Sequence, residues 1–77
     1  MIFLEQQKFL LGQIVITPAA LQVLSVEDIC RAIDAHVCGD FEVVESKFVS
    51  VFRSPAGIEF CVQTSATVTT VFLAGEH

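Results

Sequence analysis

The pattern of apolar and polar positions divides the chain into strand-like and helix-like segments. Phe9–Ile16 ends in three β-branched residues and predicts a strand, in which Gly12 indicates a bulge or a close backbone approach. Lys47–Arg53 and Val68–Leu73 are β-branched and aromatic runs, and Ile58–Thr64 alternates apolar and polar side chains. Because short turns separate these last three strands, they predict an antiparallel meander.

Two helix-start signals lie between the first strand and the meander. Thr17 followed by Pro18 predicts a capped helix that runs to Leu24. Ser25 predicts the cap of a second helix, which Gly39 would end in a left-handed conformation. Apolar residues recur on one face of that second helix, and we expect them to face the core: Val26, Ile29, Cys30, Ile33 and Val37.

The order of these segments predicts one α+β domain over residues 1–77. Phe41–Glu45 is acidic and extended, which fits a connection or an edge strand. The order β-α-α-β-β-β then gives a four-stranded sheet, antiparallel or at most mixed, with both helices on one face.

The second face of this sheet is expected to be apolar as well, because Lys47–Arg53 carries apolar residues at both parities. The chain has 77 residues, of which 53% are hydrophobic and 17% charged. Soluble domains average about 45–50% apolar and about 25% charged residues. We therefore expect a two-fold homodimer that buries the excess. The expected interface residues are Val49, Val51, Cys61, Val71 and Leu73.

Acidic residues gather in one segment of a chain whose net charge is −5. They are Glu27, Asp28, Asp34, Asp40, Glu42 and Glu45. This distribution argues against direct binding to nucleic acid or to an anionic membrane, which requires basic patches. The segment is either a solvated face that keeps an apolar protein soluble, or a surface that meets a basic protein or imitates the phosphates of nucleic acid.

The cysteines and the first residues bear on localisation. The chain has three cysteines and no CxxC spacing, which favours reduced thiols and a cytoplasmic protein over a secreted disulfide scaffold. The opening MIFLEQQKFLL lacks a basic start and a cleavage site, and charged residues interrupt it. We therefore expect neither a signal peptide nor a membrane span.

The densest group of reactive side chains is His36, Cys38 and Asp40. These residues could form a nucleophile with its base, or the ligands of a metal ion or small molecule. The interpretation we favour is a helix end, with His36 near the last carbonyls and Asp40 bonded to turn backbone. The sequence contains no phosphate loop, HExxH or GxSxG motif, so we expect neither enzymatic activity nor a cofactor. Arg53 and Glu59 are expected to form a cross-strand ion pair.

Three segments carry a resemblance to known proteins: LGQIVITPAAL (Leu11–Leu21), HVCGDF (His36–Phe41) and the stretch Phe48–His77 with its TTVFLAGEH end. They resemble a group of small uncharacterised bacterial proteins carried on plasmids and other mobile DNA. Members show a start like LGQIVATPGAL, a central H-x-x-G-D followed by an aromatic residue, and an end like TTVLLPEEY. Two polar loops of that group are shortened here, at Glu42–Ser46 and at Ser65–Val68.

The resemblance implies a bacterial, mobile-DNA context and no particular activity. Together with the composition, it favours a non-enzymatic accessory protein that docks on a host or element protein, for example to modulate host defence. The alternatives are a binding module or minimal enzyme centred on His36, Cys38 and Asp40, and an acidic mimic of nucleic acid.

Overall fold

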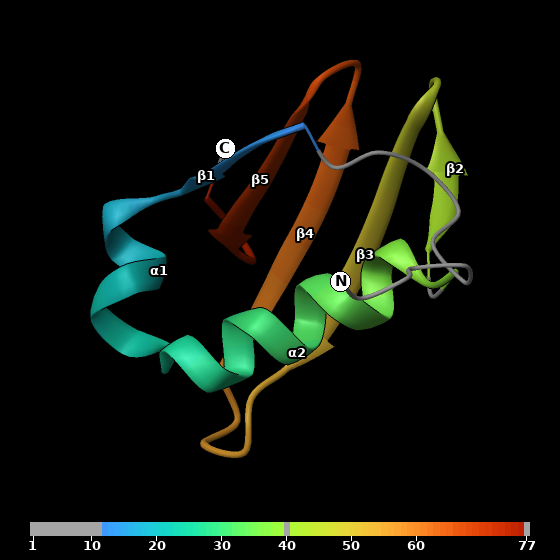
Figure 1. Cartoon of the computed structure of the whole chain (residues 1–77). Helices are drawn as coiled ribbons and strands as arrows, with labels where there is room; N and C mark the ends of the chain where they lie inside the picture. Colours follow the sequence, from blue (N-terminus) through green and yellow to red (C-terminus); the bar gives the residue numbers. More distant parts are fainter. Residues whose placement is uncertain (1–11, 40, 77) are drawn as a thin grey trace, which may run out of the picture.

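In the part of the chain that the structure describes, five strands form one mixed sheet in the order β1-β5-β4-β3-β2 (Figure 1). The computed structural model describes residues 12–39 and 41–76. The strands are β1 (Gln13–Ile16), β2 (Glu42–Val44), β3 (Lys47–Arg53), β4 (Glu59–Ser65) and β5 (Val68–Leu73). The helices are α1 (Pro18–Val23) and α2 (Val26–Val37). The α+β class predicted from the sequence is confirmed. The part of the predicted first strand before Gly12 lies outside the described residues.

The meander β3-β4-β5 is antiparallel, as its turns predicted. Arg53 pairs with Glu59 at the first turn, and Ser65 pairs with Val68 across a two-residue second turn. These registers place Ser50, Val62 and Val71 in one row across the three strands. Side chains alternate along a strand, so the row fixes which residues share a face of the sheet.

The prediction of four strands was wrong, because the segment after α2 pairs as a fifth. β2 runs antiparallel to β3, with Val44 opposite Lys47. Glu45 and Ser46 between them have φ values of 51° and 67°. Positive φ at both central residues is what a type I′ two-residue hairpin requires, usually with Asn-Gly rather than Glu-Ser. The sequence therefore lacked the ordinary signal for this hairpin.

β1 makes the sheet mixed, because it lies parallel to β5 at the opposite edge. The backbone N–H of Gln13 donates to the Thr67 carbonyl at 2.8 Å, and that of Thr17 donates to the Val71 carbonyl at 3.0 Å. Parallel neighbours need a long connection, and here the chain passes through both helices and then through β2, β3 and β4 before it reaches β5.

Both helices begin at the predicted caps and cover one face of the sheet (Figure 1). The Thr17 hydroxyl accepts from the Ala20 N–H at 3.2 Å, and the Ser25 hydroxyl accepts from the Asp28 N–H at 3.1 Å. Gly39, just beyond α2, has the predicted positive φ. Neither helix in the described part of the chain is long and apolar enough to cross a membrane.

The core lies between the helices and the sheet, and α2 presents a different side to it than predicted. Cys30 is exposed and Val26 is 72% exposed, whereas Ala32 and His36 are buried. The apolar stripe expected on α2 was therefore only partly correct. The buried core residues are Ala20, Leu24, Ile29, Ala32, Phe60, Val62 and Val71.

Candidate functional site

His36, in the last turn of α2, is fully buried and bonded to the sheet beneath it. Its Nδ1 lies 2.6 Å from the Ser50 hydroxyl and its Nε2 lies 2.9 Å from the Thr64 hydroxyl. The Thr64 hydroxyl also lies 2.8 Å from that of Thr69. Hydroxyl groups both donate and accept, so this buried group satisfies both ring nitrogens.

This arrangement supports the structural interpretation of His36 over the chemical one. Cys38 is the C-cap of α2, and its backbone N–H bonds to the carbonyls of Asp34 and His36. Within residues 12–39 and 41–76, no group of histidine, cysteine and carboxylate side chains could hold a metal ion. Asp40 lies outside the described residues, so its part in the predicted cluster stays a prediction.

The opposite face of the sheet has no described helix over it and carries a row of apolar side chains. Val51 pairs with Cys61, and Cys61 pairs with Phe72. Val51 is 64% exposed, while Cys61 and Phe72 are half-buried. In the next row Val49 pairs with Gln63. We call this surface the open face; its central residues are Val49, Val51, Cys61, Gln63 and Phe72.

Two of the residues predicted for this interface lie on the other side of the sheet. Val71 is 0% exposed and belongs to the core, and Leu73 packs against that core. The two-residue turn before β5 pairs Val71 with Val62, which faces the helices. A shift of one residue in register moves every side chain of a strand to the other face, and the prediction made that error for β5.

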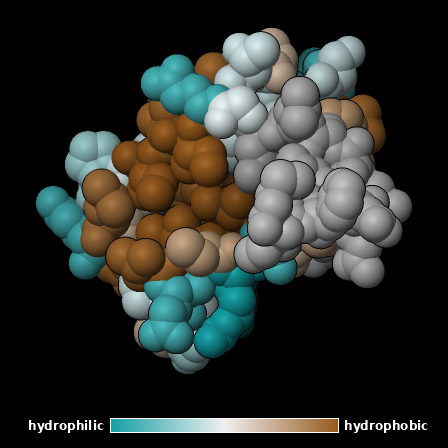
Figure 2. Space-filling model, viewed as in Figure 1, coloured by the Kyte–Doolittle hydropathy of each residue, from teal (hydrophilic) through white to brown (hydrophobic). Residues whose placement is uncertain are grey.

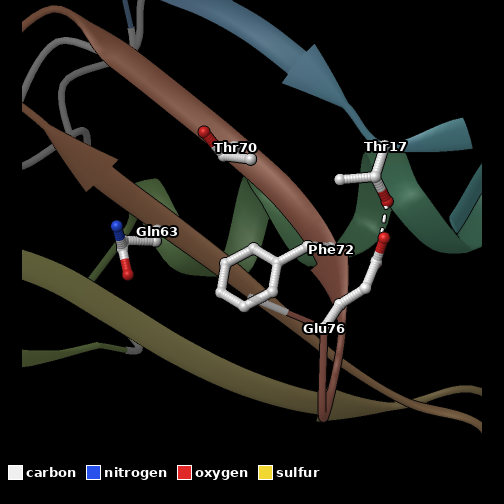
Figure 3. Close-up of a pocket in the computed structure, with 5 residues that line it drawn as sticks. All are labelled: Thr17, Gln63, Thr70, Phe72 and Glu76. Carbon is white, nitrogen blue, oxygen red and sulfur yellow. Dashed lines mark hydrogen bonds between the residues drawn. The ribbon is translucent and has the colours of Figure 1, made fainter. Parts of the chain in front are cut away.

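A pocket of about 430 Å³ opens on the β5 side of the open face, and Figure 3 shows the residues that line it. They are Thr17, Gln63, Thr70, Phe72 and Glu76. The Glu76 carboxylate accepts from the Thr17 hydroxyl at 3.0 Å and from the Leu73 N–H at 2.8 Å. The Phe72 ring lies between Gln63 and this Thr17–Glu76 bond (Figure 3). The pocket thus combines an aromatic ring, an amide and a carboxylate.

Sequence reasoning missed this pocket because it forms where three distant segments meet. Thr17 precedes α1, Gln63 lies on β4, and Glu76 follows β5. The parallel pairing of β1 with β5 brings Thr17 beside the end of β5, and that pairing had no local signal. The alternation along β5 places Phe72 on the other face of the sheet from Val71, and this was the one indication of the pocket in the sequence.

Cys61 lies near the centre of the open face beside a carboxylate. Burial raises the pKa of the Cys61 thiol above its ordinary value, and the negative charge of Glu59 raises it further. Glu59 also forms the predicted cross-strand ion pair, with its Oε2 at 3.0 Å from an Arg53 guanidinium nitrogen. A thiol with a raised pKa is a poor nucleophile at neutral pH, so Cys61 is suited to packing rather than to covalent chemistry.

The predicted acidic residues lie on two different elements. Glu27 and Asp34 are exposed on α2, and Asp28 is half-buried there. Glu27 lies 3.8 Å from Arg31, four residues on, in an exposed ion pair. Glu42 and Glu45 are exposed on β2 and the turn after it, and Asp40 lies outside the described residues. Whether these acids form a binding surface stays a prediction.

Comparison with known proteins adds no identification. No protein-family model, no curated protein and no solved structure matches the chain. The resemblance to proteins of mobile DNA therefore stays a prediction.

Proposed function

We propose that this protein is a non-catalytic interaction protein that forms a two-fold homodimer through its open face and binds a basic partner protein on its helix side. The observation that carries the proposal is the row Val51, Cys61 and Phe72, which crosses the middle of a sheet face without a described helix over it. Removing apolar area from water gains about 25 cal/mol per Å². A second copy offers the same row in return.

The charges on the open face favour a second copy as its occupant. The chain carries a net charge of −5, so two copies repel one another in most orientations. Register and alternation place Lys47 and Arg53 on the open face together with Glu42 and Glu59. These four charges cancel, and Glu76 at the β5 side of this face adds one negative charge. Two open faces therefore repel one another less than surfaces that carry more of the acidic residues.

Solution mass by light scattering, in reducing buffer, tests the homodimer. We expect the wild-type protein to be dimeric and Val51→Lys to be monomeric, because the lysine places a charge in the apolar row. Val43→Lys is the matched control: Val43 is also 64% exposed on a strand, but it pairs with Phe48 on the helix-covered side. A monomeric wild type, or a Val51→Lys variant that remains dimeric, would contradict the proposal.

The helix side remains as the outer surface of such a dimer. Figure 2 shows apolar surface gathered around α1 and between it and α2. Leu21 and Val23 on α1 and Val26 on α2 are 55%, 47% and 72% exposed, and the exposed carboxylates of Glu27 and Asp34 lie on the same helix as Val26. Apolar residues beside carboxylates suit a partner whose surface is basic around an apolar centre. The resemblance to proteins of mobile DNA suggests a host or element protein.

A charge-reversal experiment tests this second surface. The dimer is immobilised as bait and exposed to bacterial extract. The amount of a basic protein that it retains is compared between the wild type and Glu27→Lys/Asp34→Lys. We expect the double variant to lose that protein, and raised salt to weaken its binding to wild type. Glu45→Lys is the control, because it reverses an exposed acid in the turn after β2, away from α2 and from the charges counted on the open face. Equal retention on all three baits would exclude the α2 acids as the binding surface.

A further inference from the structure

The pocket at Thr17, Gln63, Phe72 and Glu76 lies at one side of the open face, and Glu76 is the one charged group among the described residues that line it. Its volume of about 430 Å³ is within the range of sites that hold a ligand or a large side chain. Glu76 supplies the charge, and its Oε1 already accepts two hydrogen bonds, from Thr17 and Leu73. A cation that reaches Glu76 would lie beside the ring of Phe72 (Figure 3).

The rows of the open face are arranged about β4 in a way that suits a two-fold axis. In each row a residue of β4 is flanked by one residue of β3 and one of β5: Cys61 between Val51 and Phe72, and Gln63 between Val49 and Thr70. An axis parallel to β4 and between two stacked sheets therefore places β3 of one copy over β5 of the other. Stacked sheets lie about 10 Å apart and remain nearly aligned.

We propose that a second copy closes this pocket: Val51 of each copy packs on Phe72 of the other, and Arg53 of each copy reaches the Glu76 carboxylate of the other. This inference rests on the proposed homodimer and adds its register. Arg53 pairs with Glu59 in the last row of the β3–β4 ladder. On the other side of β4, the Ala74 N–H donates to the Glu59 carbonyl at 3.1 Å. The two-fold axis thus brings Arg53 over the chain segment that leads to Glu76.

The chemistry of the pocket matches a guanidinium group. The Arg53 side chain is 67% exposed although it pairs with Glu59, so it is accessible to a second carboxylate. Within the pocket, Glu76 offers a carboxylate, Gln63 an amide oxygen and Phe72 a ring face, and a guanidinium can bind all three kinds of group. Because the dimer is symmetric, each such contact occurs twice.

A double-mutant cycle on dimer dissociation tests the contact between Arg53 and Glu76. Arg53→Ala and Glu76→Gln are each expected to weaken the dimer about fivefold, since two partly exposed ion pairs are lost. The double variant is expected to be no weaker than either single variant. Glu76→Gln keeps an oxygen for Thr17 and Leu73. Arg31→Ala is the matched control, because Arg31 is also an exposed arginine paired with a glutamate in its own chain, on α2.

Cross-linking at Cys61 tests the axis independently of charge. In a Cys30→Ser/Cys38→Ser background, a bifunctional thiol reagent with a span of about 5 Å is expected to join the two Cys61 thiols, because side chains that face one another across sheets about 10 Å apart bring their sulfur atoms closer than the backbones. The same reagent is expected to leave the variant with Cys30 as its only cysteine uncross-linked. Disruption of the dimer by Val51→Lys would support the open-face dimer by itself. If, in addition, the effects of Arg53→Ala and Glu76→Gln are additive and Cys61 does not cross-link, the register proposed for that dimer is wrong. If wild type is monomeric, both proposals fail.

Discussion

The imidazole of His36 on α2 is hydrogen-bonded to the hydroxyl of Ser50 on β3, at 2.6 Å and away from solvent. This contact links helix and sheet at a position where the core would otherwise be apolar. Since Thr64 bonds the second ring nitrogen, the orientation of the ring is set from both sides. A buried polar group of this kind costs free energy unless its partners are present, so it specifies how α2 lies on the sheet.

Replacing His36 is therefore expected to be costly. His36→Ala removes two hydrogen bonds and leaves a cavity, and we expect a loss of about 3 kcal/mol in the free energy of unfolding. Ser50→Ala removes one of these partners and is expected to cost about 1–2 kcal/mol. Urea denaturation measures both. Thr67→Ala, at an exposed turn, is the control; if His36→Ala unfolds at the same midpoint as this control, the buried group contributes nothing.

The sequence predicted the elements better than their arrangement. Thr17-Pro18 and Ser25 predicted the two helix starts, because a capping side chain acts on backbone within its own turn. The partner strand of β1 and the face of Val71 depend instead on contacts between distant segments. The hairpin at Glu45 was missed because neither of its turn residues is a usual choice for positive φ.

The candidate site was predicted in part for the same reason. Val49, Val51 and Cys61, which the sequence predicted as interface residues, share the open face because they lie on two strands whose register their own turn sets. Their part in an interface stays a prediction. His36 was recognised as notable, but its burial was not foreseen. The available signal was the set of hydroxyl residues Ser50, Thr64 and Thr69, which occupy core-facing positions on three adjacent strands.

Gly12 is expected to be essential for docking β1 onto β5. It has a φ of +66°, and a Cβ at this position would lie 2.0 Å from the Thr67 carbonyl oxygen, a contact that backbone must move to relieve. We expect Gly12→Ala to cost more than about 2 kcal/mol, since both strain and the β1–β5 pairing are affected. Thermal unfolding measures the loss.

Gly57→Ala separates the cost of a positive φ from the cost of the close approach to the Thr67 backbone. Gly57 also has a positive φ, of +86°, but an added Cβ there meets nothing within 4 Å. Its substitution should therefore show the conformational cost alone, about 1 kcal/mol. Equal losses for the two variants would mean that the close approach to Thr67 has no energetic weight.

The reactivity of Cys61 is expected to depend on pH in a defined direction. Burial and then Glu59 raise its pKa, so little thiolate exists at neutral pH. In a Cys30→Ser/Cys38→Ser background at concentrations that keep the protein monomeric, alkylation should be slow at pH 7 and should rise only at a higher pH than alkylation of an unburied thiol. Glu59→Gln should lower the pKa and speed labelling at pH 8. Labelling by mass spectrometry that is fast and unchanged between pH 7 and 9 would contradict this.

The same shift makes stability depend on pH. The pKa of the Cys61 thiol is higher in the folded state than in the unfolded state, where a thiol has a pKa of about 8.5. Its contribution to stability is therefore complete below the unfolded pKa and is lost as pH rises through the folded pKa. The urea midpoint of the monomer should therefore fall above about pH 8.5. The urea midpoint of the Cys61→Ser variant should fall less over the same pH interval. If the midpoints of the two proteins fall in parallel, Cys61 is not responsible for the pH dependence.

Glu76 joins two parts of the fold, because its carboxylate accepts from Thr17 before α1 and from the backbone of Leu73 at the end of β5. Thr17 is also the N-cap of α1, so one carboxylate stabilises the strand end and the helix start together. Glu76→Ala is expected to cost about 1 kcal/mol and to speed hydrogen exchange of the Leu73 amide, whereas Glu76→Gln keeps an oxygen acceptor and should cost less than about 0.5 kcal/mol. Amide exchange followed by NMR resolves the local effect. Glutamine lacks the negative charge but keeps an acceptor oxygen, whereas alanine lacks both. If the glutamine variant exchanges as fast as the alanine variant, the negative charge rather than the hydrogen-bond geometry holds the strand end.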